Sequence, residues 1–206
     1  MIGKIEQFNF RELHHRYLLL LNDDQNIMVA SKAFPHEEGD NALLLYGYID
    51  HEAGISFEVL GFARQIEGQP IQYRDTSPDT ALKLRYDSVK GVLGHVSTTL
   101  EFYRYKSRVD VINQHYNVHF AVEHIRTIES LDKYRSPQYP DDIIVFFVKE
   151  NCKPEGIWVR LEKNIGDKLA GRILNEPWAD YGYHTGDYIR IEPVVKNNEL
   201  LPIAIL

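Results

Sequence analysis

The sequence predicts an α+β fold with an antiparallel N-terminal sheet, one or two central helices, and a small, strongly curved antiparallel β-module at the C-terminus. Three observations predict it. Short apolar runs separated by turn residues fill the first third, helix-like periodicity occupies the middle, and strand-like alternation returns near the end. With 206 residues, the chain can form one large domain or two small ones.

The first third is expected to form strands joined by short connections. Asn22-Asp23-Asp24 is a turn signal between two apolar runs, which makes these runs a candidate hairpin. Connections this short favour antiparallel pairing, because parallel strands need a long crossover. The expected strands are residues 16–21, 27–30, 42–49, 55–62 and 71–73.

The middle of the chain is expected to be helical. Ser77-Pro78-Asp79-Thr80 combines a capping hydroxyl, a first-turn proline and an early acid, which together predict a helix start. Apolar residues then recur at helical spacing, so this helix should end near residue 95. A second helix is expected from Ala121 and should end before Ser136-Pro137. The segment 98–113 fits a helix or a strand.

Residues 136–142 are the expected linker, because they contain two prolines and few apolar side chains. This divides the chain into an α+β region, residues 1–135, and a β-module, residues 136–206, which can also pack as one globular unit. In the module, the clean alternation of 157–162 turns Ile157, Val159 and Leu161 to one side. The strands expected there are 142–148, 157–162, 168–174 and 187–192.

The C-terminal third resembles the YegJ-like family of uncharacterised bacterial domains. The matching segments are Phe147-Val-Lys149, Glu155-Gly-Ile-Trp158, Gly171-Arg-Ile-Leu-Asn-Glu-Pro177 and Gly186-Asp187. They are similar to the family pattern F-x-V-K, E-x-x-W, G-x-L-x-N-x-P and G-D-x-V. The resemblance implies an accessory domain without an evident catalytic role, of a kind that occurs near immunity and other interaction proteins.

Composition argues against several functional classes. The net charge is −7 and no basic tail or stripe is present, so we expect no nucleic-acid partner. The single cysteine, Cys152, cannot form an intramolecular disulfide, which is typical of a reducing compartment. The apolar runs are too short to span a bilayer, and the first residues lack a signal-peptide pattern. We therefore expect a cytoplasmic protein without a membrane partner.

An aromatic and polar surface on the β-module is the favoured functional site. Trp, Tyr and Arg dominate protein-binding hot spots because they bury a large area and keep a polar handle. The alternative is that Trp158 and Trp178 cover the end of a small barrel and belong to its core. The candidate residues are Trp178, Asp180, Tyr181, Tyr183 and His184 in the loop 175–186, with Trp158, Arg160, Tyr188 and Arg190 on neighbouring strands.

A metal site is the competing hypothesis. On one continuous helix, His115, His119 and Glu123 would share a face, and two histidines with a carboxylate suit zinc. Residues 116–122 also alternate like a strand, which would turn both histidines to solvent instead. The remaining clusters are expected to be surface or structural groups: His14-His15, His36 with Glu37, Glu38 and Asp40, and Cys152 with His184.

Two functions follow from these features. The first is a non-enzymatic binding protein, such as an immunity or adaptor protein, whose acidic surface would favour a basic protein partner. The second is a small metal-dependent hydrolase that uses the central histidines. The sequence contains neither a phosphate-binding loop nor a nucleophile elbow, which favours the first hypothesis, and no cofactor is expected.

Overall fold

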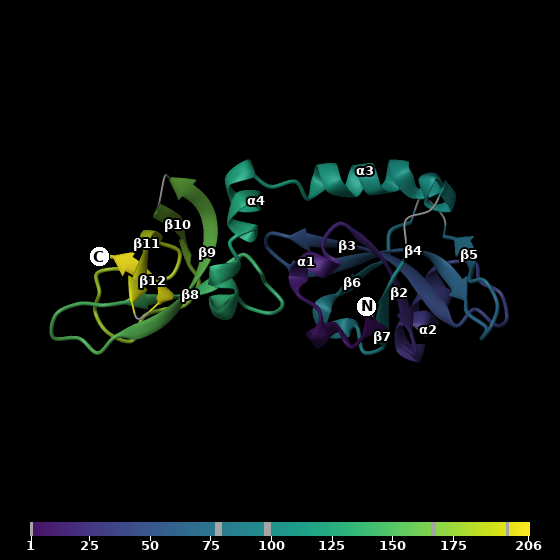
Figure 1. Cartoon of the computed structure of the whole chain (residues 1–206), viewed down its shortest axis with the longest axis horizontal. Coiled ribbons are helices and arrows are strands. Elements are labelled where there is room, and N and C mark those ends of the chain that lie inside the picture. The colour runs from purple at the N-terminus through teal and green to yellow at the C-terminus, as the bar shows by residue number, and fades with distance from the viewer. Residues whose placement is uncertain (1, 77–79, 97–99, 166–167, 197) are drawn as a thin grey trace. The chain divides into compact units, whose positions relative to one another are not determined.

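A computed structural model describes residues 2–76, 80–96, 100–165, 168–196 and 198–206. The chain forms two compact units, Met1–Asn117 and Val118–Leu206 (Figure 1). Each unit has a hydrophobic core of its own. The predicted α+β class is confirmed, with an antiparallel sheet in the first unit and a small closed barrel in the second.

The first unit is built on an antiparallel seven-stranded sheet with the order β1-β7-β2-β3-β4-β5, in which β6 also pairs with β4. The predicted strands 16–21, 42–49, 55–62 and 71–73 are confirmed to within a few residues. The strands are β1 (Ile2–Gly3), β2 (Arg16–Leu21), β3 (Ala42–Asp50), β4 (Gly54–Arg64), β5 (Gln72–Asp75), β6 (Lys83–Arg85) and β7 (Val92–His95).

Hydrophobic layers cover both faces of this sheet, so the two central strands β3 and β4 are buried along almost their whole length. On one face, the layer joins α1 (Phe10–Leu13) and α2 (Asp24–Ala33) to residues such as Leu43, Leu45 and Phe57. On the other face, it joins the 3₁₀ helix η3 (Leu100–Tyr105) and α3 (Lys106–His115) to Leu44, Tyr46 and Leu60. Figure 1 shows α3 running along the sheet.

The prediction of a strand at 27–30 is wrong, because these residues lie in α2. Asp23 caps this helix: its carboxylate accepts a hydrogen bond from the Asn26 amide at 3.2 Å. The same carboxylate accepts from the amides of Lys90 and Gly91, at 2.8 and 2.9 Å. The aspartate that we interpreted as part of a turn therefore starts a helix and fastens it to a distant segment.

The prediction of a helix from 77 to about 95 is also wrong in the described part. Residues 77–79, which carry the start signal, lie outside the described residues. The remainder forms β6, the 3₁₀ helix η2 (Tyr86–Ser88) and β7. Gly91 allows this arrangement, because a Cβ there would lie 2.2 Å from the carbonyl oxygen of Leu21. Of the ambiguous segment 98–113, the described residues are helical.

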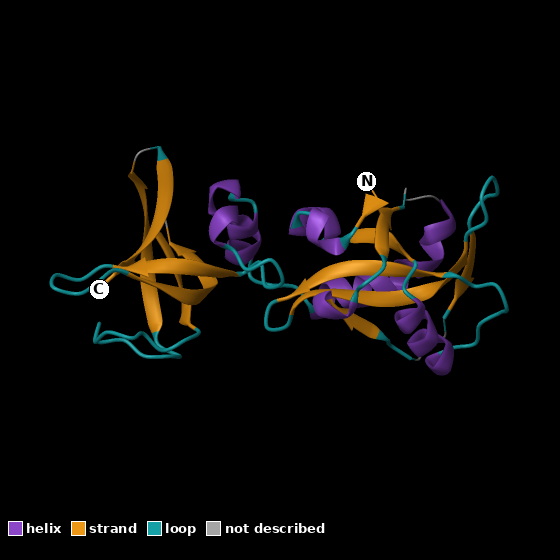
Figure 2. Ribbon diagram, turned by 90° about the horizontal axis from the view of Figure 1, so that it is seen from below, coloured by secondary structure: helices purple, strands orange, loops and turns teal. Residues whose placement is uncertain are grey.

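The second unit contains a closed five-stranded barrel with the order β10-β11-β12-β8-β9 (Figure 2). Consecutive strands pair antiparallel, and β12 closes the barrel by pairing parallel to β8. Ile157, Val159 and Leu161 are fully buried, as predicted from their alternation. The strands are β8 (Asp142–Phe147), β9 (Glu155–Ile165), β10 (Lys168–Ile173), β11 (Tyr188–Lys196) and β12 (Glu199–Ile205).

The sequence did not predict β12, which contains a proline. Pro202 lies opposite Pro193 of β11, so the two residues that cannot donate a hydrogen bond face each other. The strand consequently keeps its other pairs with β11 and still reaches β8, where Ile203 lies opposite Phe146.

Two helical segments precede the barrel and belong to its unit. These are α4 (Phe120–Arg126) and the 3₁₀ helix η4 (Glu129–Tyr134), and they add Ile125, Leu131 and Tyr134 to the barrel core. The second predicted helix is thus present but interrupted after Arg126. None of the described helices has the length and apolar character needed to cross a membrane.

The structure places the boundary between the units at Asn117 and Val118, ahead of the linker expected at 136–142. That segment is an ordered loop of the second unit. The Ser136 amide donates to the Asp142 carbonyl at 2.9 Å, and the Asp142 amide donates to the Tyr139 carbonyl at 2.9 Å. Pro137 and Pro140 therefore lie in a closed turn before β8. Prolines are common in such turns as well as in linkers, which explains the incorrect expectation.

Candidate functional site

The connection between β10 and β11, residues 174–187, is a tightly folded loop on the surface of the second unit. Gly182 and Gly186 have φ angles of 78° and 91°, which a residue with a Cβ adopts only with strain. Pro177 fixes its own φ nearby. These residues direct the chain through sharp turns. We call this segment the Trp178 loop, after its exposed tryptophan.

Hydrogen bonds close the base of the Trp178 loop onto the barrel. The Leu174 amide donates to the Trp158 carbonyl at 2.8 Å, and the Trp158 amide donates to the Asn175 side chain, also at 2.8 Å. At the other end of the loop, the Gly186 amide donates to the Ile173 carbonyl at 2.9 Å. Both ends of the loop are therefore anchored to strands β9 and β10.

Glu176 ties the two arms of the loop together. Its carboxylate accepts hydrogen bonds from the amide and the hydroxyl of Thr185, at 2.9 and 3.1 Å, and lies 2.6 Å from His184 Nδ1. The bonds from His184 and Thr185 lower the pKa of Glu176 to about 2. The bond to Glu176 raises the pKa of His184. The carboxylate is thus ionised at neutral pH and holds both partners.

Tyr181 fastens the loop to the barrel core. Its side chain is only 4% exposed, and its ring meets Phe147 edge to face with centroids 5.4 Å apart. Its hydroxyl donates to the carbonyl of Lys153 at 2.7 Å. We expected Tyr181 on the binding surface, but it is a core residue, because Phe147 and Lys153 satisfy both its ring and its hydroxyl. Tyr183 is half-buried beside the same phenylalanine.

Trp178 has a fixed backbone and a free side chain. Its amide donates to both carboxylate oxygens of Glu155 at 3.0 Å, which holds this peptide against the start of β9. The indole is 96% exposed, so it does not cover the end of the barrel, contrary to the alternative considered from the sequence. A large ring presented on a fixed loop can enter a pocket of another molecule without prior ordering.

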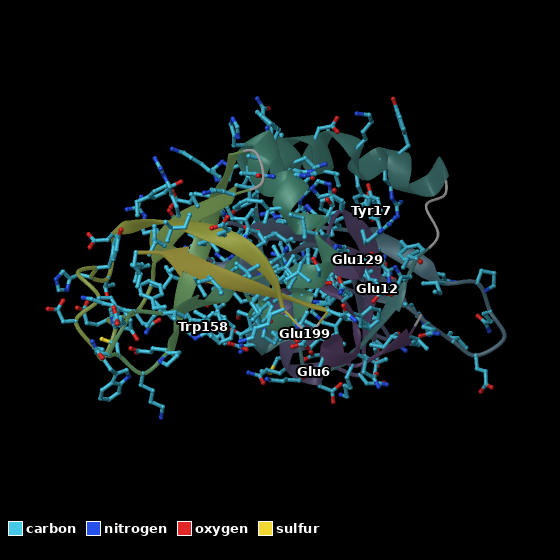
Figure 3. All side chains as sticks on the ribbon, turned by 60° about the vertical axis from the view of Figure 1, so that its left-hand side comes forward. Glu6, Glu12, Tyr17, Glu129, Trp158 and Glu199 are labelled. Carbon is cyan, nitrogen blue, oxygen red and sulfur yellow. The ribbon has the colours of Figure 1, made fainter. Side chains whose placement is uncertain are left out.

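The other candidate residues divide between a structural ion pair and exposed groups. Arg160 binds Asp142 through two hydrogen bonds of 2.7 and 3.0 Å, which fasten β9 to β8. Trp158, labelled in Figure 3, lies on the same strand and is partly buried. The Lys163 ammonium lies 5.3 Å from the ring centroid of Tyr188. The exposed candidates besides Trp178 are Asp180, His184, Tyr188 and Arg190.

The central histidines belong to two separate helices. His115 ends α3 in the first unit, whereas His119 caps α4 and Glu123 lies within α4 in the second. His119 Nδ1 accepts from the Ala121 amide at 3.2 Å, and Glu123 binds Arg126 at 2.7 Å. Neither the continuous helix nor the strand considered from the sequence is present. Within the described ranges, no group of three or more His, Cys, Asp or Glu side chains could hold a metal ion.

The other polar clusters have structural partners. Glu37 and Asp40 form ion pairs with Arg74 at 2.5 and 3.2 Å, which tie their loop to β5. Cys152 is half-buried against the barrel core, and His184 pairs with Glu176. Ion pairs therefore account for Glu37, Asp40 and His184.

Sequence reasoning assigned no structural role to the two carboxylates that shape the Trp178 loop, Glu155 and Glu176. Glu155 lies 23 residues before Trp178, and no periodicity relates the two positions. Glu176 stands closer, but a glutamate between Asn175 and Pro177 carries no signal that it will bind residues eight and nine positions later. Only the fold brings these partners together.

Comparisons with protein-family models, with curated proteins and with solved structures find no match to this chain.

Proposed function

We propose that the second unit is a protein-binding module without catalytic function, and that Trp178 is the central residue of its binding surface. The observation that carries this proposal is a 96% exposed indole on a loop whose backbone is held at both ends and in the middle. Exposing a large apolar ring to water is unfavourable in free energy, and interface hot spots are enriched in tryptophan.

The energetics favour an anchor role. Burying a tryptophan removes roughly 150–250 Å² from water, which at about 25 cal/mol per Å² corresponds to about 4–6 kcal/mol before the costs of association. Ordering a loop on binding consumes part of such a gain. Because the Trp178 loop is already ordered by Glu176, Tyr181 and Glu155, this cost is small here.

The charge of the loop supports a basic partner. Residues 174–187 include Glu176, Asp180 and Asp187 and contain neither lysine nor arginine. An acidic rim around an apolar anchor accelerates association with a positively charged protein and leaves the affinity mainly to the buried ring. We therefore propose a partner with an apolar pocket bordered by lysine or arginine residues.

The resemblance to YegJ-like domains, which implies an accessory role, agrees with this proposal. The metal-dependent hydrolase has less support, because its proposed ligands His115, His119 and Glu123 are separated between two units and two of them are engaged locally.

The proposal is tested by affinity capture from a lysate of the source cell with three full-length baits: wild type, Trp178→Ala and Tyr103→Ala. Tyr103 lies in the first unit and is 73% exposed, so it controls for nonspecific binding to an exposed aromatic ring. We expect one protein, in stoichiometric amount, on the wild-type and Tyr103→Ala baits and not on Trp178→Ala. An identical set of proteins on all three baits would exclude the Trp178 loop as the binding surface.

A further inference from the structure

The first unit contains a cavity of about 320 Å³ between α3 and the sheet. This volume lies at the lower end of the range for small-molecule sites. Ala81, Val111 and Ile112 supply its apolar lining. Charged or aromatic residues of α3, β4 and β6, among them His115, supply the rest together with Tyr116, which follows α3. The cavity lies on the face of the sheet that α3 covers, because Ile112 belongs to that hydrophobic layer.

A buried ion pair forms one wall of the cavity. Glu58 is 3% exposed, and its carboxylate binds Arg108 at 2.8 Å. Arg108 also donates to the Thr76 hydroxyl at 2.7 Å and to the Val59 carbonyl at 3.0 Å. A buried charge is tolerated only when it is paired and hydrogen-bonded, and here both conditions are met. Arg108 therefore neutralises Glu58 and fastens α3 to β4.

A tyrosine and a lysine form another part of the lining. Tyr116, the residue that follows α3, stacks on the buried Tyr48 with ring centroids 4.3 Å apart. The Lys83 ammonium donates to the Tyr116 hydroxyl at 2.5 Å and lies 5.1 Å from the centroid of its ring. An ammonium has three donors, so Lys83 retains two for a ligand.

Among the described residues that line the cavity, Lys83 is a cation without a carboxylate partner. Arg108 is paired with Glu58, and Arg85, which follows Lys83 by two residues on β6, is paired with Asp50 at 3.1 Å. Among the described residues, Lys83 forms no ion pair with a carboxylate. The C-terminus of α3 contributes roughly half a negative charge, which is less than the full charge of the lysine. The cavity therefore attracts anions.

We infer that this cavity binds a small organic anion, in which a carboxylate or a phosphate monoester is attached to a compact apolar group. Lys83 binds the anionic group, and Tyr116, Val111 and Ile112 contact the apolar group. This ligand site lies in the first unit and is independent of the protein-binding function proposed for the second.

The test is a ¹⁵N NMR titration of the full chain with phenyl phosphate and with benzoate, which separate the two kinds of anionic group. Benzyl alcohol is the neutral control, and inorganic phosphate is the control without an apolar group. We expect saturable shifts of the Lys83, Val111 and Tyr116 amides with at least one of the aromatic anions, and at least tenfold weaker binding of both controls. Equal binding of benzyl alcohol, equal binding of inorganic phosphate, or no saturable shift overturns the inference.

Substitutions at two exposed positions, Lys83 and Val111, test the lining without disturbing the core. Lys83 is exposed, so Lys83→Gln should fold. It should weaken binding of the aromatic anion at least tenfold, because it removes the uncompensated positive charge. Val111 is 65% exposed, so Val111→Glu and Val111→Gln should both fold. The glutamate should weaken the anion relative to the isosteric glutamine by repulsion. Unchanged affinity in Lys83→Gln, or equal affinity in the two Val111 variants, contradicts the inference.

Discussion

At the residue scale, three side chains hold the Trp178 loop in its conformation. Tyr181 anchors the loop in the barrel core, and Glu176 joins its two arms. Glu155 holds the Trp178 backbone, which leaves the indole as the exposed group. The loop is therefore already ordered before a partner binds, so binding costs little conformational entropy, and this favours Trp178 as a strong anchor.

The contact between Glu176 and His184 makes the loop sensitive to pH. The pKa of His184 is raised, so the contact stabilises the loop fully below 6.5, the unperturbed value, and weakens as the pH rises through the raised pKa. The pKa of Glu176 falls to about 2, so its contribution is complete above the ordinary value of 4.5 and is lost as the pH falls toward 2. The charged pair is thus fully formed between about pH 4.5 and 6.5.

An NMR titration of the His184 ring checks this expectation. In the wild type, His184 should titrate above 6.5, and Glu176→Gln should shift its pKa down toward that value. Asp180→Asn is the matched control, because Asp180 raises the pKa of His184 less than Glu176 does. A wild-type pKa at or below 6.5 would show that the Glu176–His184 contact does not form in solution.

At the scale of elements, one buried ion pair fastens α4 to the barrel. Arg126 binds both carboxylate oxygens of Asp141, at 2.9 and 2.7 Å, and both side chains are only 4% exposed. Arg126 also binds Glu123, whose side chain is 41% exposed. The same guanidinium thus has one buried and one exposed carboxylate partner, which provides an internal comparison.

Asp141→Ala should lower the free energy of unfolding of the second unit by about 3–5 kcal/mol, because it leaves Arg126 buried without its main partner. Glu123→Ala should cost less than about 1 kcal/mol, because an exposed pair is screened by solvent. Urea unfolding of the two variants measures the difference. Equal losses in both variants would mean that the buried pair does not hold α4 in place.

The predicted elements show which signals a sequence contains at this scale. Strands such as β3, β4 and β9 were predicted because their own residues are apolar or alternate. The predictions for 27–30 and for the described residues 80–95 are wrong because the apolar spacing of these segments fits more than one structure. In these segments, contacts with distant residues determine the structure. The Gly91 amide donates to Asp23 at the start of α2, and the close approach of Gly91 to Leu21 places β7 beside β2.

The same limit applies to the candidate sites. Trp178 could be selected from the sequence because aromatic and turn-forming residues crowd into one short segment. The sequence does not indicate that Tyr181 is buried and Trp178 exposed, because this difference depends on contacts with Phe147, Lys153 and Glu155. The cavity in the first unit had no sequence signal, because its charged lining comes from three separate elements.

At the scale of the whole molecule, the chain consists of two units with separate cores. The second core includes Ile125, Leu131 and Tyr134, which precede the barrel strands. A unit that begins at 118 should therefore be complete, whereas one that begins at the predicted linker, residue 136, lacks these side chains and Arg126.

Two fragments test this boundary. We expect residues 118–206 to fold alone, with dispersed NMR signals and cooperative unfolding. Residues 136–206 should be less stable by several kcal/mol, because the fragment loses three buried side chains of about 1.5–3 kcal/mol each and removes Arg126, the buried partner of Asp141. Equal stability of the two fragments would place the boundary at the linker and assign α4 a peripheral role.

The central claim is that Trp178 anchors a protein partner, and the most direct test is the affinity of the purified captured protein for wild type and Trp178→Ala, measured by titration calorimetry. A hot-spot loss of at least 2 kcal/mol corresponds to roughly 30-fold weaker binding. The account predicts a loss of this size for Trp178→Ala and an unchanged dissociation constant for Tyr103→Ala. A dissociation constant for Trp178→Ala within about twofold of the wild type, or about 0.4 kcal/mol, would contradict it.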